Sequence, residues 1–372
     1  NKKRTIVTII GIILSTALMV GIGLLFSSFQ DLMIRDTISY NGRYEAYYGN
    51  VDLEKVNNIQ DKDFDYFYEK PIGFSRVSSS NEYKPYIYIV GVNSKYFDEL
   101  KLMEGTFPSN ENEIVISHHA ITNGEINYKV GDSVTFTYGS RNIDGEITLS
   151  NSDYVEGETL DITNEATYKI VGIVERSNFE SYSACGYMAF TLDVNNDKGN
   201  VNLYVMFNKN KKIIKQSEEL AKELGYDDYI SYNSTLLALY GESTYGNIMS
   251  TMVSMMIIML ALVSIGCIIV IYNSFAISVM ERKKEFGLLS SVGATRRQLS
   301  HTVFFEAVIV GIIGIVLGIV GAYIGIGCVV LVINNLISDI LEYKLYLVTN
   351  PLFIIIPVVF MILVIGVSAF LP

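Results

Sequence analysis

Charged residues are scarce in this chain, and they are unevenly distributed. Only 18% of the 372 residues are charged, against about 25% in an average globular protein, and half are hydrophobic. Residues 30–247 contain 34 acidic and 19 basic side chains, whereas the rest of the chain contains 5 acidic and 9 basic. This distribution excludes a single soluble globule, a disordered chain and a basic nucleic-acid-binding protein, so no nucleic-acid partner is expected.

Cysteine is also rare, and no nucleotide-binding motif is present in the sequence. Two of the three cysteines, Cys267 and Cys328, lie in apolar runs, which leaves Cys185 without a partner and excludes a disulfide scaffold. Cys185 has no basic or histidine neighbour in the sequence that would activate its thiol. The sequence lacks a glycine-rich loop ending in Lys-Ser or Lys-Thr, so we expect the chain not to bind ATP through a P-loop.

Residues that could ligate a metal occur in two places, and neither pattern fits a site. His118 and His119 are adjacent, and on a strand adjacent side chains point to opposite faces, so we expect a polar turn. Asp61, Asp63 and Asp65 resemble part of a calcium loop, but the glycine and the glutamate of such a loop are missing. The sequence therefore predicts no catalytic residue, no metal site, no cofactor and no enzymatic activity of its own.

Long apolar runs are what the sequence has in abundance. A bilayer core of about 30 Å needs about 20 helical residues, and each of four stretches is long enough to span it: Thr5–Phe26, Ile248–Val279, Thr302–Ile337 and Pro351–Leu371. Glu306 is the one charge within them. Basic residues precede the first run and separate the second from the third, which places both positions in the cytoplasm by the positive-inside rule.

The sequence thus predicts an integral membrane protein with four transmembrane helices and a large mixed α/β extracytoplasmic domain inserted between spans one and two. The predicted segments are a first span at 1–29, the external domain at 30–247, a second span at 248–280, a cytoplasmic segment at 281–301, a third span at 302–337, a short outer loop at 338–350 and a fourth span at 351–372. The lipid bilayer is therefore an expected partner.

The external block has the patterning of a folded mixed domain. Short β-branched and aromatic runs predict strands at Tyr86–Val90, which we expect Gly91 to end, and at Glu113–Ile116, Ser133–Thr137, Tyr168–Val174 and Asn202–Phe207. Lys211–Leu224 has one apolar helical face and Gly225 as its C-cap. Arg141–Glu165 is polar without clear periodicity, and we expect a long loop or a hairpin there.

The segment between the second and third apolar runs carries the most specific motif. It reads E-R-K-K-E-F-G-L-L-S-S-V-G-A-T-R-R-Q-L from Glu281 to Leu299, which predicts a short amphipathic helix that ends at Gly293. An ordinary charged loop that satisfies the positive-inside rule is the alternative. The motif resembles the FtsX/MacB-like family of ABC transporter permeases, in which this helix contacts a separate ATPase subunit.

External motifs strengthen the resemblance, because they occur in the order seen in the outer domains of MacB-like permeases. They are I-V-G-V-N-S-K-Y-F at Ile89–Phe97, L-M-E-G-T-F at Leu102–Phe107, N-E-I-V-I-S at Asn112–Ser117, K-V-G-D at Lys129–Asp132 and Y-K-I-V-G-I-V at Tyr168–Val174. In this family a proline at the position of Pro372 is commonly followed by an Arg-rich segment. We therefore expect a fragment of a longer polypeptide, with a second permease half as an open question.

Two groups of residues are the candidate sites. The resemblance implies that the ATPase is contacted through Glu281, Arg282, Lys283, Lys284, Glu285, Phe286, Gly287, Leu288, Leu289 and Gly293. Spacing alone predicts a helix-packing stripe at Gly311, Gly314, Gly318, Gly321 and Gly325. Glu306 is expected to reach the cytoplasmic membrane surface rather than to sit in the bilayer.

The resemblance implies a permease subunit of a bacterial ABC transporter in the cytoplasmic membrane, with residues 30–247 outside. A cytoplasmic ABC ATPase that binds the ATP, and a second permease half or subunit in a dimer-like assembly, are the implied partners. The work would be export or extraction of an amphiphilic substrate such as a peptide antibiotic or a lipoprotein. The alternative is a membrane protein that transports nothing and regulates a cell-wall hydrolase.

Overall fold

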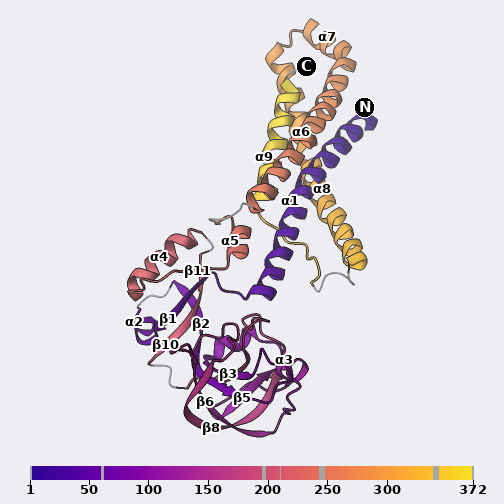
Figure 1. Cartoon of the computed structure of the whole chain (residues 1–372). Coiled ribbons are helices and arrows are strands. Elements are labelled where there is room, and N and C mark those ends of the chain that lie inside the picture. The colour runs from indigo at the N-terminus through magenta and orange to yellow at the C-terminus, as the bar shows by residue number, and fades with distance from the viewer. Residues whose placement is uncertain are drawn as a thin grey trace. The chain divides into compact units, whose positions relative to one another are not determined.

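The computed structural model describes residues 2–59, 63–194, 198–209, 211–242, 248–337 and 343–370. It divides into two compact units (Figure 1). We call Asn1–Asp36 together with Asn247–Pro372 the helical unit, and Thr37–Gly246 the sheet unit.

The long apolar helices are α1 (Lys2–Asn41), whose end extends into the sheet unit, α6 (Ile248–Glu281), α8 (Arg296–Ile337) and α9 (Leu352–Phe370). The short charged helix α7 (Lys283–Ser291) joins α6 to α8. Within the described residues, three stretches are long and apolar enough to cross a membrane: Thr5–Asn41, Met249–Glu281 and Arg297–Leu336. The apolar part of α9, Leu352–Ser368, is shorter. Helix α1 continues past the predicted boundary at residue 29, because no glycine or proline interrupts it before Gly42, which has φ +86°.

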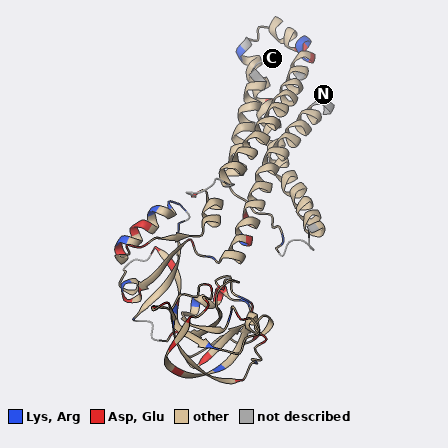
Figure 2. Ribbon diagram, in the orientation of Figure 1, with Lys and Arg blue, Asp and Glu red and all other residues tan. Residues whose placement is uncertain are grey.

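One hydrophobic core joins four helices of this unit. Ile12 of α1, Phe275 of α6, Val310 of α8 and Met361 of α9 are all buried in it. Figure 2 shows that these helices carry almost no charge along most of their length, and that charged residues lie around α7 and near the C-terminal end of α1. Apolar side chains therefore form the contacts between these helices and also cover their outward faces, where large hydrophobic side chains remain exposed.

The described part of the sheet unit forms one eleven-stranded sheet. Its strands are β1 (Ala46–Asp52), β2 (Phe64–Arg76), β3 (Tyr86–Val92), β4 (Leu102–Gly105), β5 (Glu113–Ser117), β6 (Ser133–Ile143), β7 (Glu146–Thr148), β8 (Thr159–Val174), β9 (Gly186–Leu192), β10 (Asn200–Phe207) and β11 (Ser231–Tyr232). The spatial order is β11-β1-β10-β2-β3-β9-β5-β8-β6-β7, and β4 pairs with β8.

Six of these strands close into a ring. The ring runs β2-β3-β9-β5-β8-β6, and β6 returns to β2 through the pairs Phe74↔Gly139 and Ser75↔Tyr138. Isoleucines of β3 and β5, together with Phe136 and Tyr168, fill one core of the ring. Strand β2 is 13 residues long and also pairs with β10, so it belongs both to the ring and to the open remainder of the sheet.

The open part of the sheet is covered by short helices. The helices of this unit are α2 (Leu53–Asn58), a 3₁₀ helix at Ser94–Glu99, α3 (His118–Thr122), α4 (Ile213–Leu224) and α5 (Ser234–Tyr240). Helix α4 buries Ile213, Ser217, Leu220, Ala221 and Leu224 and ends at Gly225 with φ +58°, as its sequence pattern predicts. The pattern predicts this helix because its apolar face is removed from water when it packs against the sheet.

The sheet unit differs from the local sequence patterns at two places and decides between alternatives at a third. Gly91 does not end its strand, because β3 continues to Val92 within a fully buried pairing with β9. The polar stretch Arg141–Glu165 is a hairpin region rather than a loop, since β6 and β8 pair antiparallel through Arg141↔Leu160 and Asn142↔Thr159. His118 and His119 open the short helix α3 and do not lie on a strand.

One asparagine joins two segments of the sheet unit that are distant in sequence. The Asn233 Nδ2 donates to the Gly42 carbonyl at 3.1 Å, and its backbone N–H donates to the Glu45 carbonyl at 3.2 Å. The Asn41 amide donates to Asn233 Oδ1 at 3.4 Å. Residues 41–45 and the start of α5 therefore lie side by side.

Candidate functional site

The candidate site lies where α6 and α8 are joined by α7. Helix α6 ends at Glu281, and α7 begins at once, with the Phe286 N–H donating to the Arg282 carbonyl at 2.9 Å. Gly293 has φ +101° and is followed by the next helix start. There Thr295 and Gln298 form a capping box, in which the Thr295 N–H donates to Gln298 Oε1 at 2.9 Å and the Gln298 N–H to Thr295 Oγ1 at 3.4 Å. The local sequence thus specifies a tight helix–turn–helix.

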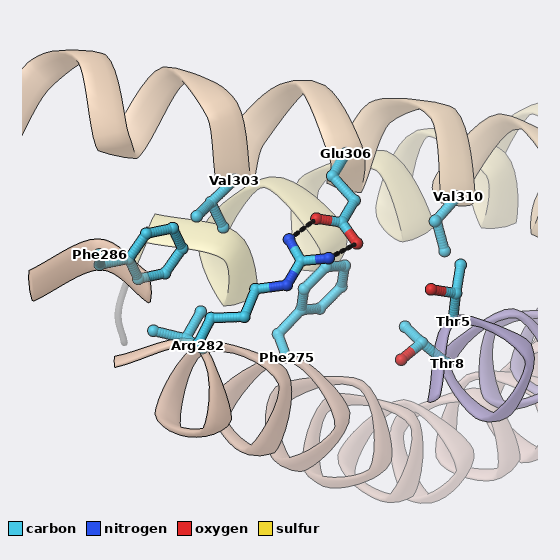
Figure 3. Close-up of a pocket in the computed structure, with 9 residues that line it drawn as sticks. Thr5, Thr8, Phe275, Arg282, Phe286, Val303, Glu306 and Val310 are labelled. Carbon is cyan, nitrogen blue, oxygen red and sulfur yellow. Dashed lines mark hydrogen bonds and ion pairs between the residues drawn. The ribbon is translucent and has the colours of Figure 1, made fainter. Parts of the chain in front are cut away.

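An ion pair links this turn to the body of α8. Arg282 reaches Glu306 with both terminal nitrogens, and the Nη2–Oε1 distance is 3.2 Å (Figure 3). The two side chains are 30% and 31% exposed. A bidentate arginine–carboxylate pair fixes orientation as well as charge. Glu306 therefore has a specific partner at the start of the predicted coupling segment.

A small pocket of about 20 Å³ surrounds the ion pair, which is room for about one water molecule. Figure 3 shows Phe286 of α7 beside Val303 of α8, Phe275 of α6 next to the ion pair, and Thr5 and Thr8 of α1 on the other side. The arrangement brings four helices of the unit to one point. The ion pair and Phe286 therefore connect the turn to the other helices of the unit.

The apolar side chains of α7 divide into two groups. Phe286 is half-buried in the pocket, whereas Leu288 is 64%, Leu289 51% and Val292 88% exposed. The resemblance implies that Phe286, Leu288 and Leu289 all contact the ATPase, and Val292 is not among the residues it implies. Helical period accounts for Leu288, which is two positions from Phe286 and faces the opposite side. Leu289 is three positions from Phe286 and shares its side of the helix, but it does not belong to the pocket lining, and Val292 follows the end of α7 at Ser291.

The glycine stripe of α8 contacts two different helices over only part of its length. A Cβ placed on Gly314 would lie 2.5 Å from Ile12 Cγ2, and one on Gly318 would lie 2.6 Å from Thr16 Cβ, both on α1. Gly311 faces Ile365 of α9 at 3.2 Å. Close contact between helix backbones is what small residues allow in such bundles.

The other two stripe positions differ from this pattern. Gly321 would make an ordinary contact of 3.8 Å, and no described atom lies within 4 Å of a Cβ on Gly325. Sequence reasoning also missed Gly23 of α1, where a Cβ would lie 2.6 Å from Phe353 Cβ. Heptad spacing identifies one face of a helix, but it does not show where along that face a neighbour lies.

The residues considered as metal ligands are dispersed in the structure. Within the described part of the chain, no group of three or more His, Cys, Asp or Glu side chains could hold a metal ion. Asp61 lies outside the described residues, Asp63 pairs with Lys209 at 3.3 Å, and Asp65 pairs with Lys95. His119 Nδ1 lies 2.8 Å from Glu180 Oε1.

The Cys185 thiol is buried beside charged residues that are distant in sequence. Burial raises its pKa to about 12, although Arg141 and Lys84 act in the opposite direction. The fold thus brings two cations near Cys185 that are distant from it in sequence, but neither activates the thiol, because burial dominates. The thiol is therefore in its protonated, unreactive form at neutral pH.

Comparison with known proteins identifies the family. A sequence model of the MacB-like periplasmic core domain matches residues 5–220, which is more than half of the chain, and a model of the FtsX-like permease C-terminal region matches residues 257–372. The chain belongs to the FtsX/MacB-like family of ABC transporter permeases. Helix α7, the Arg282–Glu306 pair and the glycine stripe all lie within the FtsX-like match.

Two individual proteins are similar to this permease. The ABC transporter permease YtrF of Bacillus subtilis (strain 168) is 25% identical over 300 residues, which are 72% of this chain and 65% of that protein. The chain thus matches slightly less than two thirds of its relative's length. The crystal structure of the extracellular domain of the noncanonic ABC-type transporter YknZ from Gram-positive bacteria is 13% identical, covers 50% of this chain and 98% of its own, and has a TM-score of 0.28.

Proposed function

We propose that this permease transmits ATP-driven movement from a separate cytoplasmic ABC ATPase to the sheet unit outside the cell. In this proposal the bacterial cytoplasmic membrane contains the helical unit with α9 as its fourth span, and residues 30–247 are external. A second permease half or subunit completes the assembly. The substrate is an amphiphile, such as a peptide antibiotic or a lipoprotein, that is exported or extracted from the membrane.

The observation that carries the proposal is the exposed apolar group on α7. Leu288, Leu289 and Val292 project from a segment that also presents Lys283 and Lys284. A positive-inside anchor requires only the cations. Exposed leucines beside charges are what a docking helix needs, because buried apolar side chains carry most of the binding energy in protein interfaces.

The Arg282–Glu306 pair supports a mechanical role for this segment. Its two residues belong to the α6–α7 junction and to α8, and Phe286 fills the space beside them. A force on α7 would therefore act on two long helices at once instead of bending a free loop. The sequence contains no P-loop, so in this proposal ATP is bound and hydrolysed by the partner.

The test removes the apolar group and keeps every charge. The Leu288→Ser/Leu289→Ser variant should bind the co-purifying ATPase at least about 30-fold more weakly, as expected when a hot spot of about 2 kcal/mol is lost, and should fail to stimulate ATP hydrolysis. Pull-down and ATPase assays in nanodiscs measure both effects. The purified chain alone should hydrolyse no ATP.

Two controls accompany this experiment. Ile147→Ser removes an equally exposed apolar side chain, 69% exposed, from the sheet unit and should leave binding unchanged. Cys185 cannot report topology because it is buried, so a cysteine at exposed Glu156, in a background without the three native cysteines, reports it instead. Full binding and stimulation by the double variant would show that α7 is only a charged loop.

A further inference from the structure

The sheet unit contains a cavity of about 730 Å³. Its walls come from strands that are distant in sequence, with Tyr47 and Asn50 on β1, Glu69 on β2, Tyr88 on β3 and Asn202 on β10. The polar segment 150–152 closes one side. Sites for small molecules in proteins generally measure 300–1,000 Å³, so this cavity has a suitable size for one.

Three of the strands that line the cavity are irregular at that place. The register of β1 shifts between Tyr48 and Val51, where Asn50 has φ +56°. The register of β2 shifts between Pro71 and Gly73, and that of β6 shifts just before Ser140. Asn50, Pro71 and Ser140 all line the cavity. Bulges of this kind are over-represented beside functional sites, where they redirect side chains.

One charged side chain lines the cavity, and it is a carboxylate. Glu69 is 7% exposed, and it accepts hydrogen bonds from Asn202 Nδ2 at 3.0 Å and from the Tyr96 hydroxyl at 3.2 Å. No lysine, arginine or histidine belongs to the described lining. A carboxylate offers about four acceptor positions, so Glu69 retains acceptor capacity for a ligand.

The pKa of the Glu69 carboxyl is raised, because burial disfavours its charged form. Hydrogen bonds from Asn202, Tyr96 and Tyr204 act in the opposite direction without reversing the shift. A cation in the cavity would favour ionisation of Glu69, because an opposite charge within a few ångström stabilises the carboxylate. An anionic ligand would give no such stabilisation.

Aromatic rings supply the rest of the environment. Tyr47, Tyr88 and Phe179 line the cavity, and the Tyr47 ring also lies 5.0 Å from that of Tyr204. Ring faces attract ammonium and guanidinium groups and accommodate apolar bodies. The acidic surface of residues 30–247, with 34 acidic against 19 basic side chains, adds a general attraction for cations.

We propose that this cavity binds an organic cation, whose ammonium or guanidinium group pairs with Glu69 and whose apolar body lies against Tyr47, Tyr88 and Phe179. The hydroxyl and amide groups of residues 150–152 receive the polar part of the ligand. This binding site goes beyond the proposed coupling function and does not depend on it, since no nucleotide and no partner protein are required for binding.

The absence of tryptophan from the chain provides a direct assay. Ile147 lines the cavity and is 69% exposed on β7, so Ile147→Trp places a single fluorophore at the rim. The full chain in nanodiscs is titrated with 4-phenylbutylammonium, 4-phenylbutanol and 4-phenylbutyrate, and empty nanodiscs correct for lipid partition. We expect saturable binding of the ammonium compound, at least about tenfold tighter than that of the neutral alcohol, and no binding of the carboxylate.

A second variant tests the role of Glu69. In the Ile147→Trp background, Glu69→Gln keeps the side-chain shape and should remove the preference for the ammonium compound, whereas Glu156→Gln, which removes an exposed acid, should keep it. Equal binding of the three compounds, preference for the carboxylate, no saturable binding at all, or an unchanged preference in Glu69→Gln would each overturn the proposal. If Glu69→Gln does not fold, the three-compound series alone decides. No ATPase is present, so failure here leaves the coupling proposal untouched.

Discussion

Replacement of Arg141 by methionine should strongly destabilise the sheet unit. The Arg141 and Glu158 side chains are both 0% exposed and form an ion pair. The Arg141 Nε donates to Glu158 Oε1 at 3.0 Å, Nη1 to the Ser150 carbonyl at 2.8 Å and Nη2 to the Asp153 carbonyl at 2.8 Å. One side chain thus satisfies a buried carboxylate and several backbone carbonyls.

The magnitude follows from what Arg141→Met leaves behind. Removal of one partner of a buried pair costs about 3–5 kcal/mol, because the other charge stays buried without compensation. The carbonyls of Ser150 and Asp153 lose their donors as well, which favours the upper half of that range. For a unit of this size each kcal/mol corresponds to roughly 2–4 °C in Tm, so Tm should decrease by roughly 8–20 °C. The double variant Arg141→Met/Glu158→Leu should lose less than Arg141→Met alone.

Thermal unfolding of the purified chain in detergent, followed by near-ultraviolet circular dichroism, measures these shifts. Lys101→Met is the matched control, because Lys101 pairs with Glu175 at 2.8 Å but the two side chains are 69% and 52% exposed. Exposed pairs contribute about 0–1 kcal/mol. A loss in Arg141→Met no larger than in Lys101→Met would refute the reasoning. So would a double variant less stable than the single one.

Two further predictions concern the helical contacts and pH. Gly318→Ala should destabilise the helical unit by about 1–3 kcal/mol, since its Cβ would meet Thr16 Cβ at 2.6 Å and the Ile13 carbonyl oxygen at 2.9 Å. Gly325→Ala should leave the stability unchanged. Equal losses of stability in the two variants, measured by unfolding in detergent, would contradict the contact. Burial raises the pKa of Glu45 from 4.5 to about 7, although a hydrogen bond from the Phe207 N–H acts in the opposite direction. The contribution of Glu45 to the free energy of unfolding is therefore complete below pH 4.5, and it is lost as pH rises through 7. Denaturant midpoints between pH 4.5 and 8 should fall less steeply in Glu45→Gln than in the native chain, and parallel slopes would contradict this assignment.

Local patterns predicted those elements whose residues interact with near neighbours. Periodicity acts over only a few residues. It predicts the apolar face of α4 with its glycine cap, and the central residues of strands β3, β5, β6, β8 and β10. The family followed from the motif at Glu281–Leu299, and the two sequence models confirm it. These features need no knowledge of which segments meet in space.

The features that sequence reasoning missed all depend on distant contacts. Arg141 lies in a polar stretch that gives no sign of burial, and its carboxylate partner is 17 residues away across a hairpin. The Arg282–Glu306 pair joins residues 24 apart. The sequence did not distinguish Phe286 from its exposed neighbours, because the pocket that Phe286 enters is formed by four helices and is visible only in the folded structure. Periodicity can give a residue's face, but only the tertiary fold gives its neighbour.

The contacts of Asn233 have a consequence for how this protein could change over evolutionary time. A segment whose two ends lie close together can be replaced by another folded domain without separating the elements on either side. Residues 42–233 form such a segment, because Asn233 contacts Gly42 and Glu45. Descendants of this chain could therefore exchange this segment, or acquire a larger one, while the inherited helices keep their own contacts. The sheet unit would then diversify separately from the long helices.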